Sequence, residues 1–364
     1  MKAIALVPGT HNVQMLDVDE PKITAPDEVK IKMWQVGICG TDREQVEGGR
    51  ADAPIGKDRL IIGHEMFGQV VEVGSAVTKV APGDFGVFTV RRGCGQCDAC
   101  TANRSDMCFT GKYTERGIKA ADGFQAAYVV DKEQYVVKVP ESIKEIGVLT
   151  EPMSVAAKAI EEALLVQESR LKDFIKNDNC KKALVAGIGA IGLMAAFALR
   201  LRGAHVVGMD VVDEDTLRPQ ILKQIGGTYV DGRKVETTNL DEVCGVADFI
   251  FEATGIAQLQ VELIDALAIN GVYVATGIPA GSRPQTINAG NLMQQLVLKN
   301  QIVLGSVNAG MEHFKIAVAD LEASLQQWPD AIQQIITERL PYTQFSKALH
   351  QHNANEIKVV VDWT

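Results

Sequence analysis

The sequence predicts an α/β protein with two domains, a barrel-like antiparallel β domain followed by a doubly wound parallel sheet. Residues 1–150 contain short segments rich in β-branched and aromatic residues, separated by Pro-Gly and Gly-Gly turns. Near residue 150 the pattern changes to alternating strands and helices, which is typical of a parallel sheet covered on both faces. The chain has 364 residues, enough for two or three domains.

The first domain is expected to contain five strands, because these segments combine strand-forming residues with flanking turns. They are residues 1–6, 28–36, 67–73, 85–90 and 126–130. No strand–helix alternation occurs among them, which favours antiparallel pairing.

The second domain is expected to begin with a helix at 152–167, which has good helix formers and no internal glycine. Strands at 183–186, 205–210, 249–252 and 272–276 then alternate with helices at 191–202, 216–225 and 259–267. A helix at 313–327 and a strand at 357–362 complete the chain. The residues alone leave open whether this tail completes the second domain or returns to the first.

Composition disfavours several classes of protein. Apolar residues make up 46% and charged residues 23%, an ordinary globular balance. The net charge is −10 without a Lys/Arg-rich run, so nucleic acid is a poor partner. The longest uncharged run, 183–199, contains three glycines and is too short to span a membrane. The N-terminal apolar stretch, 3–7, is too short for a signal peptide, so we expect a cytoplasmic protein with reduced thiols.

The strongest local motif is C-x2-C-x2-C-x7-C at Cys94, Cys97, Cys100 and Cys108. Four thiolates joined by small or polar residues suit one tetrahedral ion, and all-thiolate ligation without water is typical of structural zinc. An iron–sulfur cluster uses similar spacing, although Phe109 stands where a proline usually follows the fourth cysteine. Four ordinary thiols are the other alternative.

A second group of ligand types lies earlier in the chain. Cys39 stands in Gly-Ile-Cys-Gly-Thr-Asp, and His64 and Glu65 stand in Gly-His-Glu-Met-Phe-Gly. Alone, such a cysteine is more often a small core residue, and such a histidine a hydrogen-bonded structural residue. Together, thiolate, imidazole and carboxylate suit a catalytic zinc with an open position. Asp42 is a candidate to orient His64 by accepting a hydrogen bond from the imidazole ring.

A glycine-rich motif, G-x-G-x-x-G, follows a predicted strand and opens a predicted helix, which is the context that a dinucleotide fingerprint requires. It consists of Gly187, Ile188, Gly189, Ala190, Ile191 and Gly192. The glycines permit a tight turn and close approach of a pyrophosphate, and the helix N-terminus offers free N–H groups. Asp210, at the end of the next strand, can accept from a ribose 2′-OH and repels a 2′-phosphate. A glycine-rich turn without a ligand is the alternative.

Together these motifs resemble the zinc-containing medium-chain dehydrogenase/reductase superfamily over nearly the whole chain. Gly63-His64-Glu65-x-x-Gly68-x5-Gly74-x-x-Val77 is similar to its zinc signature, and Pro82-Gly83-Asp84-x-x-Val87 is similar to its usual turn and strand. The resemblance implies a GroES-like β-barrel catalytic domain at 1–152 with a structural zinc lobe at 94–108. It also implies a Rossmann cofactor-binding domain at 153–307 and a return of 308–364 to the catalytic domain.

Within the superfamily, the sequence most resembles archaeal-type glucose 1-dehydrogenases, at residues 113–118, 122–124, 149–154, 305–308 and 313–314. The resemblance implies catalytic zinc ligands at Cys39, His64, Glu65 and Glu151, with Glu65 binding directly or through water. It implies sugar contacts at Thr41, Glu115, Glu151 and Asn308. Further cofactor contacts are implied at Thr254, Gly277, Val307 and Asn308. For Glu115 the alternative is a surface pair with Lys112 or Arg116.

Two departures from the family pattern affect specificity. Ser154 and Val155 occupy the stretch in which some members carry an acidic sugar contact, so the sugar stays open. Many members that accept NADP have arginines directly after the second strand, whereas this chain has none between Asp210 and Arg218. That difference favours NAD, with NADP possible.

We therefore predict an NAD-linked dehydrogenase with two zinc ions per subunit, acting as a homodimer or homotetramer. It would oxidise C1 of an aldose such as D-glucose or D-galactose to the lactone, with zinc as a Lewis acid. Thr41, with water or a neighbouring carboxylate, would carry the proton out. Two other functions stay open: a polyol, alcohol or amino-alcohol dehydrogenase of the same superfamily, and a non-catalytic dinucleotide-binding redox sensor.

Overall fold

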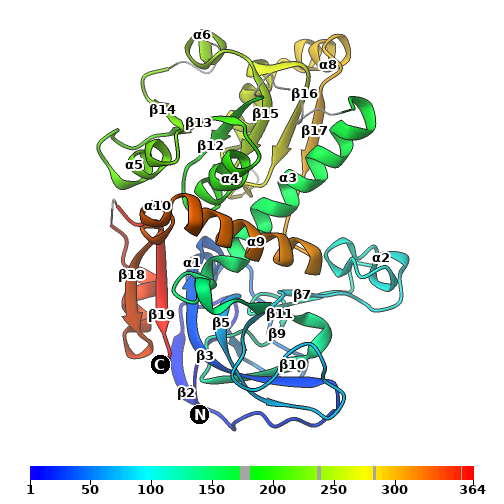
Figure 1. Ribbon diagram of the computed structural model, residues 1–364, viewed down its shortest axis with the longest axis vertical. Helices are drawn as coiled ribbons and strands as arrows, with labels where there is room; N and C mark the ends of the chain where they lie inside the picture. Colours follow the sequence, from blue (N-terminus) through cyan, green and yellow to red (C-terminus); the bar gives the residue numbers. More distant parts are fainter. Residues whose placement is uncertain (173–180, 236–238, 282–283, 354) are drawn as a thin grey trace. The chain divides into compact units, whose positions relative to one another are not determined.

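The computed structural model describes residues 1–172, 181–235, 239–281, 284–353 and 355–364 (Figure 1). The chain divides into two compact units. The first contains Met1–Ser154, Asn308–Leu325 and Gln333–Thr364, and the second contains Val155–Val307 and Gln326–Ile332. Each unit has its own sheet system, and they are described separately.

The first unit is built around a seven-stranded sheet, in which six strands follow the order β11-β6-β5-β3-β19-β18 and β10 also pairs with β3. The strands are β3 (Glu28–Ile38), β5 (Glu65–Val73), β6 (Phe85–Phe88), β10 (Tyr128–Lys132), β11 (Val136–Val139), β18 (Ile336–Pro341) and β19 (Lys358–Asp362). All pairs are antiparallel except β18–β19. Because β19 pairs with β3, the end of the chain joins the sheet formed by its first third.

Two three-stranded sheets complete the β structure of this unit. One has the order β2-β1-β4, with β1 (Lys2–Leu6), β2 (Val13–Asp17) and β4 (Leu60–Ile61); the other has the order β7-β8-β9, with β7 (Arg91–Arg92), β8 (Thr114–Arg116) and β9 (Ala120–Ala121). On the seven-stranded sheet, Trp34, Phe67 and Phe85 form an aromatic cluster, with the Trp34 and Phe85 ring centroids 4.8 Å apart. The core therefore depends on aromatic side chains from β3, β5 and β6.

Short helices connect these strands. They are α1 (Gly40–Val46), α2 (Asp98–Thr101), α11 (Phe345–His350) and the 3₁₀ turns η1 (Ser105–Met107), η2 (Glu133–Tyr135), η3 (Glu141–Ile143), η4 (Gly147–Leu149) and η7 (Tyr342–Gln344). Two longer helices contain residues of both units: α3 (Thr150–Arg170) belongs to the second unit from Val155 onward, and α9 (Met311–Gln327) belongs to the first unit up to Leu325. The short helix α10 (Pro329–Gln333) lies in the second unit except for Gln333.

The second unit is a six-stranded parallel sheet with the order β14-β13-β12-β15-β16-β17. Its strands are β12 (Lys182–Ala186), β13 (His205–Asp210), β14 (Thr228–Asp231), β15 (Ala247–Glu252), β16 (Leu267–Ala275) and β17 (Ile302–Gly305), and its helices include α4 (Ala190–Leu201), α5 (Leu217–Gln224), α6 (Leu240–Cys244), α7 (Ala257–Glu262) and α8 (Ala289–Leu298) (Figure 1). The strand order reverses between β12 and β15, which is where a doubly wound sheet binds its ligand.

Most predicted elements are present, and the differences have physical causes. The predicted helix at 259–267 is wrong in its second half, because α7 ends at Glu262, a 3₁₀ turn (η6, Leu263–Ala266) follows, and Leu267 already begins β16. Several strands were not predicted: in the first unit β2, β4, β7, β8, β9, β11 and β18, and in the parallel sheet β14 and β17. The two in the parallel sheet lie at its edges. Both have only four residues; β14 has the mixed sequence Thr-Tyr-Val-Asp, whereas β17 is apolar but too short to stand out as a strand.

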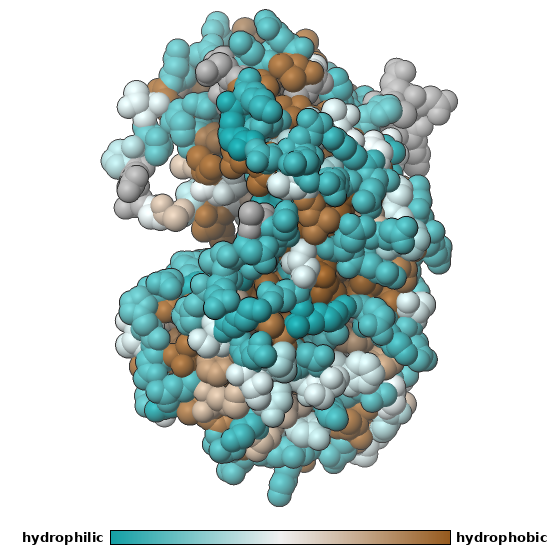
Figure 2. Space-filling model, turned by 90° about the vertical axis from the view of Figure 1, so that its left-hand side faces the viewer, coloured by the Kyte–Doolittle hydropathy of each residue, from teal (hydrophilic) through white to brown (hydrophobic). Residues whose placement is uncertain are grey.

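Among the described residues, no helix is long and apolar enough to cross a membrane. On the face drawn in Figure 2, hydrophilic residues predominate and hydrophobic residues occur in separate patches. That pattern is ordinary for a protein surface in contact with water.

Candidate active site and metal centres

The first candidate centre combines Cys39, His64 and Glu65, each of which offers a ligand atom within 4.8 Å of the others. Cys39 lies between the end of β3 and the start of α1, and His64 directly precedes β5. Because β3 and β5 pair side by side in the central sheet, the end of β3 lies next to the start of β5, and Cys39 and His64, 25 positions apart in sequence, come together there. A thiolate, an imidazole and a carboxylate together are a ligand set that suits zinc.

The carboxylate of Glu65 lies in a cradle that requires glycine on the neighbouring strand. Gly37 pairs with Glu65, and a Cβ at Gly37 would lie 2.1 Å from the Glu65 Oε2 atom. That oxygen is buried and has no hydrogen-bond partner among the described residues. A buried carboxylate oxygen without a partner is costly unless a cation binds it. The residues present therefore fit a divalent metal ion.

The other carboxylate oxygen of Glu65 binds Lys358, a residue that the sequence analysis did not identify. Lys358 Nζ lies 2.6 Å from Glu65 Oε1 and 3.2 Å from the carbonyl oxygen of Ile38, and both side chains are buried. Burial alone would lower the pKa of Lys358, but the negative charges of Glu65 and Cys39 raise it. A single lysine within the apolar strand β19 was the only sequence signal for this contact.

Asp42 lies next to the ring of His64, which it was expected to orient. Its Oδ1 atom is 3.4 Å from His64 Nδ1, and its Oδ2 atom accepts a hydrogen bond from the Cys39 amide at 2.8 Å. Burial alone would lower the pKa of His64, whereas the charge of Asp42 and contacts with Asp42 and Cys39 raise it well above its usual value. Asp42 therefore contacts both the histidine and the cysteine of the cluster.

Glu151 and Thr41 lie on the helices next to this cluster. Glu151 is in the first turn of α3 and is buried, but it does not belong to the group of ligand atoms within 4.8 Å of one another. Burial, with the carboxylates of Glu65 and Asp42, raises the pKa of Glu151 to about 7 against the opposing charges of His64 and Lys358. Thr41 is half-buried in the first turn of α1, two residues after Cys39.

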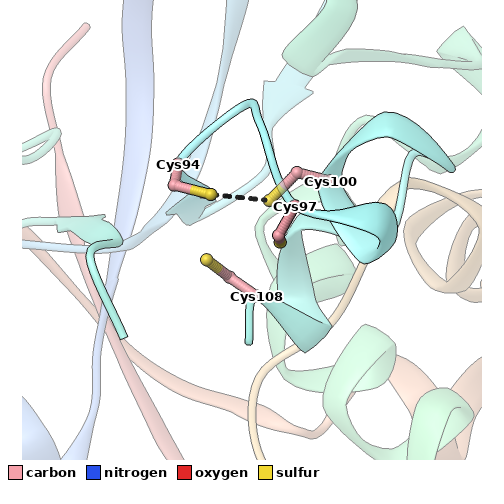
Figure 3. A group of neighbouring side chains, drawn as sticks. All are labelled: Cys94, Cys97, Cys100 and Cys108. Carbon is pink, nitrogen blue, oxygen red and sulfur yellow. Dashed lines mark hydrogen bonds between the residues drawn. The ribbon is translucent and has the colours of Figure 1, made fainter. Parts of the chain in front are cut away.

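The second candidate centre is formed by Cys94, Cys97, Cys100 and Cys108, whose sulfur atoms all lie within 4.8 Å of one another (Figure 3). The Cys94 and Cys100 sulfurs are 3.9 Å apart, far longer than a disulfide bond. Sulfurs at the corners of a tetrahedron with ~2.3 Å bonds to zinc are roughly 3.8 Å apart. A single ion therefore fits, whereas an iron–sulfur cluster divides its four thiolates among two or four irons and so holds some of them further apart.

The environment of these sulfurs favours thiolates at some positions. Hydrogen bonds from the Thr110 hydroxyl and from the amides of Gln96 and Cys97 lower the pKa of Cys94 to about 6. The Thr110 hydroxyl also lowers the pKa of Cys108, whereas burial raises that of Cys100 to about 12. All four are free cysteines. The expectation of reduced thiols also covers Cys180, which lies outside the described residues.

The glycine-rich loop in the second unit borders a cavity of about 340 Å³. Gly187, Gly189, Asp210, Arg218 and Thr254 are among its lining residues. Gly187 has φ +82°, and a Cβ there would contact Ala253 and Thr254. Gly189 caps α4 and faces open space, so backbone N–H groups are accessible at this helix N-terminus. The arrangement suits a dinucleotide.

Within the same motif, the other residues have structural positions. The Ile188 side chain is buried, Ala190 and Ile191 begin α4, and a Cβ at Gly192 would lie 1.8 Å from the Gly187 carbonyl oxygen. Gly192 therefore permits close packing of α4 on the loop.

Asp210 already has several partners at the end of β13. Its Oδ2 atom accepts a hydrogen bond from the Ile188 amide at 3.1 Å, and its Oδ1 atom accepts one from the Val211 amide at 2.7 Å. Arg218 Nη1 lies 3.5 Å from Oδ2. The residue thus joins the glycine-rich loop to the cavity wall, and a cation from α5 lies beside it.

Glu252, at the end of β15, is a second residue that the sequence analysis missed. Its Oε1 atom accepts hydrogen bonds from the amides of Thr254 and Gly255, and its Oε2 atom accepts one from Gln260. A Cβ at Gly277 would lie 2.9 Å from Glu252 Oε2. Two of the expected cofactor contacts, Thr254 and Gly277, are therefore positioned by one buried carboxylate.

The expected sugar contacts lie in the first unit. Glu115 on β8 binds Arg91 on β7, with Arg91 Nε and Nη2 at 3.0 and 2.9 Å from Glu115 Oε1. The alternative of a surface pair with Lys112 or Arg116 is wrong, because Glu115 is mostly buried and Arg116 pairs with Asp131. The cross-strand register, which the sequence does not reveal, determines this partner.

Asn308 has a strained backbone, with φ +53° in the left-handed region. Both of its amide side-chain atoms are buried without a hydrogen-bond partner among the described residues. A buried amide without partners is able to bind a ligand that supplies them. The neighbouring Val307 belongs to the second unit, where its carbonyl oxygen accepts a hydrogen bond from the buried Lys158.

Comparisons with known proteins match both parts of the chain. The model of the alcohol dehydrogenase GroES-like domain matches residues 25–141, and that of the glucose dehydrogenase C-terminus matches residues 144–363. Glucose 1-dehydrogenase 2 of Vulcanisaeta moutnovskia is 36% identical over 364 residues, which cover 100% of this chain and 99% of the relative. Glucose 1-dehydrogenase of Methanocella arvoryzae is 34% identical with the same coverage.

Solved structures of dehydrogenases also match this chain over nearly its whole length. Haloferax mediterranei glucose dehydrogenase in complex with NADP, Zn and gluconolactone matches with a TM-score of 0.90 at 30% identity, covering 100% of this chain and 99% of that one. The 2R,3R-butanediol dehydrogenase of Bacillus subtilis matches with a TM-score of 0.78 at 25% identity, covering 99% of each chain.

Proposed function

The chain belongs to the glucose dehydrogenase family of zinc-containing alcohol dehydrogenases, and we propose that it oxidises C1 of an aldose such as D-glucose to the lactone with NAD(P). The observation that carries this proposal is the cluster of Cys39, His64 and Glu65 with its partnerless carboxylate oxygen. Full-length similarity to glucose 1-dehydrogenases supplies the substrate class.

Two zinc ions per subunit are part of the proposal. Cys39, His64 and Glu65 would hold one ion, with Glu151 as a further ligand, and Cys94, Cys97, Cys100 and Cys108 would hold the other. At the first site, bound zinc supplies Lewis acidity that makes the C1 hydroxyl of the sugar easier to deprotonate. The four-cysteine site has no position for water and so serves structure.

The chain's own residues then orient the substrate and move the proton. Asp42 contacts the ring of His64, and Lys358 binds Oε1 of Glu65, which leaves Oε2 without a partner among the described residues. The hydroxyl proton leaves through Thr41 Oγ1 to water or to a neighbouring carboxylate. A bound nicotinamide cofactor would accept the hydride from C1, which is the chemistry that the cofactor supplies.

Sugar recognition is assigned to Thr41, Glu115, Glu151 and Asn308. Glu115 Oε1 is occupied by Arg91, which leaves Oε2 for a hydroxyl group, and the buried amide of Asn308 can both donate and accept. A carboxylate and an amide side chain can together bind two neighbouring hydroxyl groups of a sugar.

The cofactor is assigned to the cavity beside Gly187, Gly189 and Thr254. We propose a preference for NAD over NADP, because the carboxylate of Asp210 borders this cavity and repels a 2′-phosphate. Arg218 lies beside Asp210 and is the residue that would accommodate a 2′-phosphate if NADP is also accepted.

The working state is proposed to be a homodimer or homotetramer in the cytoplasm. Support comes from the edge strand β17 and from exposed apolar residues on it and on the preceding helix α8, namely Met293, Val297, Leu298 and Val303. The reduced cysteines suit a reducing compartment.

The proposal is tested by absorbance at 340 nm with NAD or NADP and a panel of aldoses, polyols and simple alcohols. Glucose, galactose or xylose should react, and Glu115→Ala and Asn308→Ala should each lower kcat/KM for the sugar by about ten- to a hundredfold. Oxidation of polyols alone would favour the alternative dehydrogenase. Tight NADH binding without turnover of any alcohol would favour the redox sensor.

A further inference from the structure

We propose that Arg91 is a positioning residue for sugar binding: it fixes the carboxylate of Glu115 and is itself fixed by the backbone of the four-cysteine lobe, residues 94–108. The inference rests on the proposed function, because it assigns Glu115 to the sugar. It gives the four-cysteine lobe a role in substrate affinity in addition to its role in stability.

Arg91 binds Glu115 in a geometry that determines where the carboxylate lies. The two residues are cross-strand partners on β7 and β8, and Nε and Nη2 of the arginine both approach Glu115 Oε1. The guanidinium group also lies 3.8 Å from the centroid of the Tyr113 ring. Only 9% of the Arg91 side chain and 15% of the Glu115 side chain are exposed. A buried, charge-assisted contact of this kind fixes orientation.

The remaining guanidinium nitrogen connects Arg91 to the four-cysteine lobe. Arg91 Nη1 donates a hydrogen bond to the carbonyl oxygen of Asp106 at 2.9 Å. Asp106 lies in η1, between the third and fourth cysteines, and its buried carboxylate pairs with Arg104 at 2.8 Å. Cys100 and Cys108 flank η1, so a metal ion held by these cysteines would restrain the turn whose carbonyl group Arg91 binds.

The same turn also contacts the loop that carries the second sugar residue. A Cβ at Gly310 would lie 2.5 Å from Asp106 Oδ1, so the Asp106 carboxylate packs directly against the backbone at Gly310. Gly310 follows Asn308 by two residues. The lobe therefore contacts Glu115 through Arg91 and contacts the Asn308 loop through Asp106.

The test compares Arg91→Lys, which keeps the charge but loses the fork, with Arg92→Lys as the matched control. Arg92 is the next residue on β7, is 13% exposed, pairs with Asp131 and lies 3.8 Å from the Tyr135 ring centroid, so it is equally buried without touching Glu115. Arg91→Lys should raise KM for glucose and the dissociation constant of gluconolactone about tenfold. kcat and NAD(P)H affinity should change less than about twofold, and Arg92→Lys should leave KM unchanged.

A double-mutant cycle then tests whether Arg91 acts through Glu115. Arg91→Lys introduced into Glu115→Gln should raise KM by much less than about tenfold, because the residue through which it acts is already altered. Effects that multiply would overturn the inference. If Arg91→Lys does not fold, Tyr113→Leu removes the ring beneath the guanidinium, and an unchanged gluconolactone affinity in that variant also overturns it.

Measurements on the wild type distinguish a failure of this inference from a failure of the proposed function. If the wild-type protein oxidises no aldose, both the proposed function and the positioning role of Arg91 are refuted. A wild type that oxidises glucose, together with an Arg91→Lys variant of unchanged KM and gluconolactone affinity, removes the positioning role alone.

Discussion

The cradle around Glu65 gives the sharpest prediction, since it tests the metal site by adding one methyl group outside the ligands. In Gly37→Ala, the new Cβ would lie 2.1 Å from Glu65 Oε2, 3.1 Å from Glu65 Cβ and 3.2 Å from Glu65 Cδ. The carboxylate is fully buried, and its other oxygen is bound by Lys358, so it has little room to move. Overpacking of this kind costs about 1–3 kcal/mol, or roughly 2–10 °C in Tm for a domain of this size.

The expected consequence is loss of the ion at the first centre only. Elemental analysis of purified Gly37→Ala should find one zinc per subunit where the wild type has two, with glucose oxidation lost. The matched control is Gly40→Ala, three residues further on, where an added Cβ meets no atom within 4 Å. Gly40→Ala should keep both ions. A Gly37→Ala protein with two zinc ions and wild-type kcat/KM would refute the role assigned to Glu65.

Three further predictions concern the four-cysteine site, the choice of cofactor and the ion pairs of Asp131. Cys97→Ser should lower the zinc content by one ion and lower Tm, and full metal content with unchanged Tm would exclude a structural ion there. In Asp210→Ala, the ratio of kcat/KM for NAD to kcat/KM for NADP should fall by about tenfold. A wild type that prefers NADP would contradict the proposed repulsion between Asp210 and the 2′-phosphate. Burial alone would raise the pKa of Asp131, but the guanidinium groups of Arg92 and Arg116 lower it. The ion pairs of Asp131 with these arginines therefore stabilise the folded state at pH values above the ordinary aspartate pKa of ~3.9. Asp131→Asn should lower the free energy of unfolding at neutral pH by about 1–3 kcal/mol, and a urea titration should show this difference shrinking as the pH falls below that value; a difference independent of pH would contradict it.

Ligand types and glycine spacing were sufficient to bring candidate residues together, because these features depend on local sequence. Cys39, His64 and Glu65 were grouped because their chemistry is complementary, and the structure places their ligand atoms close together. The strand–glycine–helix order located a glycine-rich loop that borders a cavity. Contacts that depend on strand register could not be predicted. Lys358 reaches Glu65 only because β19 pairs with β3, and Arg91 reaches Glu115 only because β7 pairs with β8.

Edge strands show the same limit within the fold. The central strands β12 and β15 are almost fully buried and are mainly apolar, whereas the edge strands β14 and β17 are partly exposed and only four residues long. Their place in the sheet follows from tertiary pairing, which no local pattern encodes.

We expect aldose oxidation to require a metal ion at Cys39, His64 and Glu65. The direct measurement is the 340 nm rate with glucose and NAD(P), made on the same preparation before chelation, after partial chelation and after zinc is added back, with zinc content determined at each stage. We predict that the rate disappears while one zinc per subunit and the folded state remain, and that added zinc restores it. A rate that persists after all zinc has been removed would contradict the account.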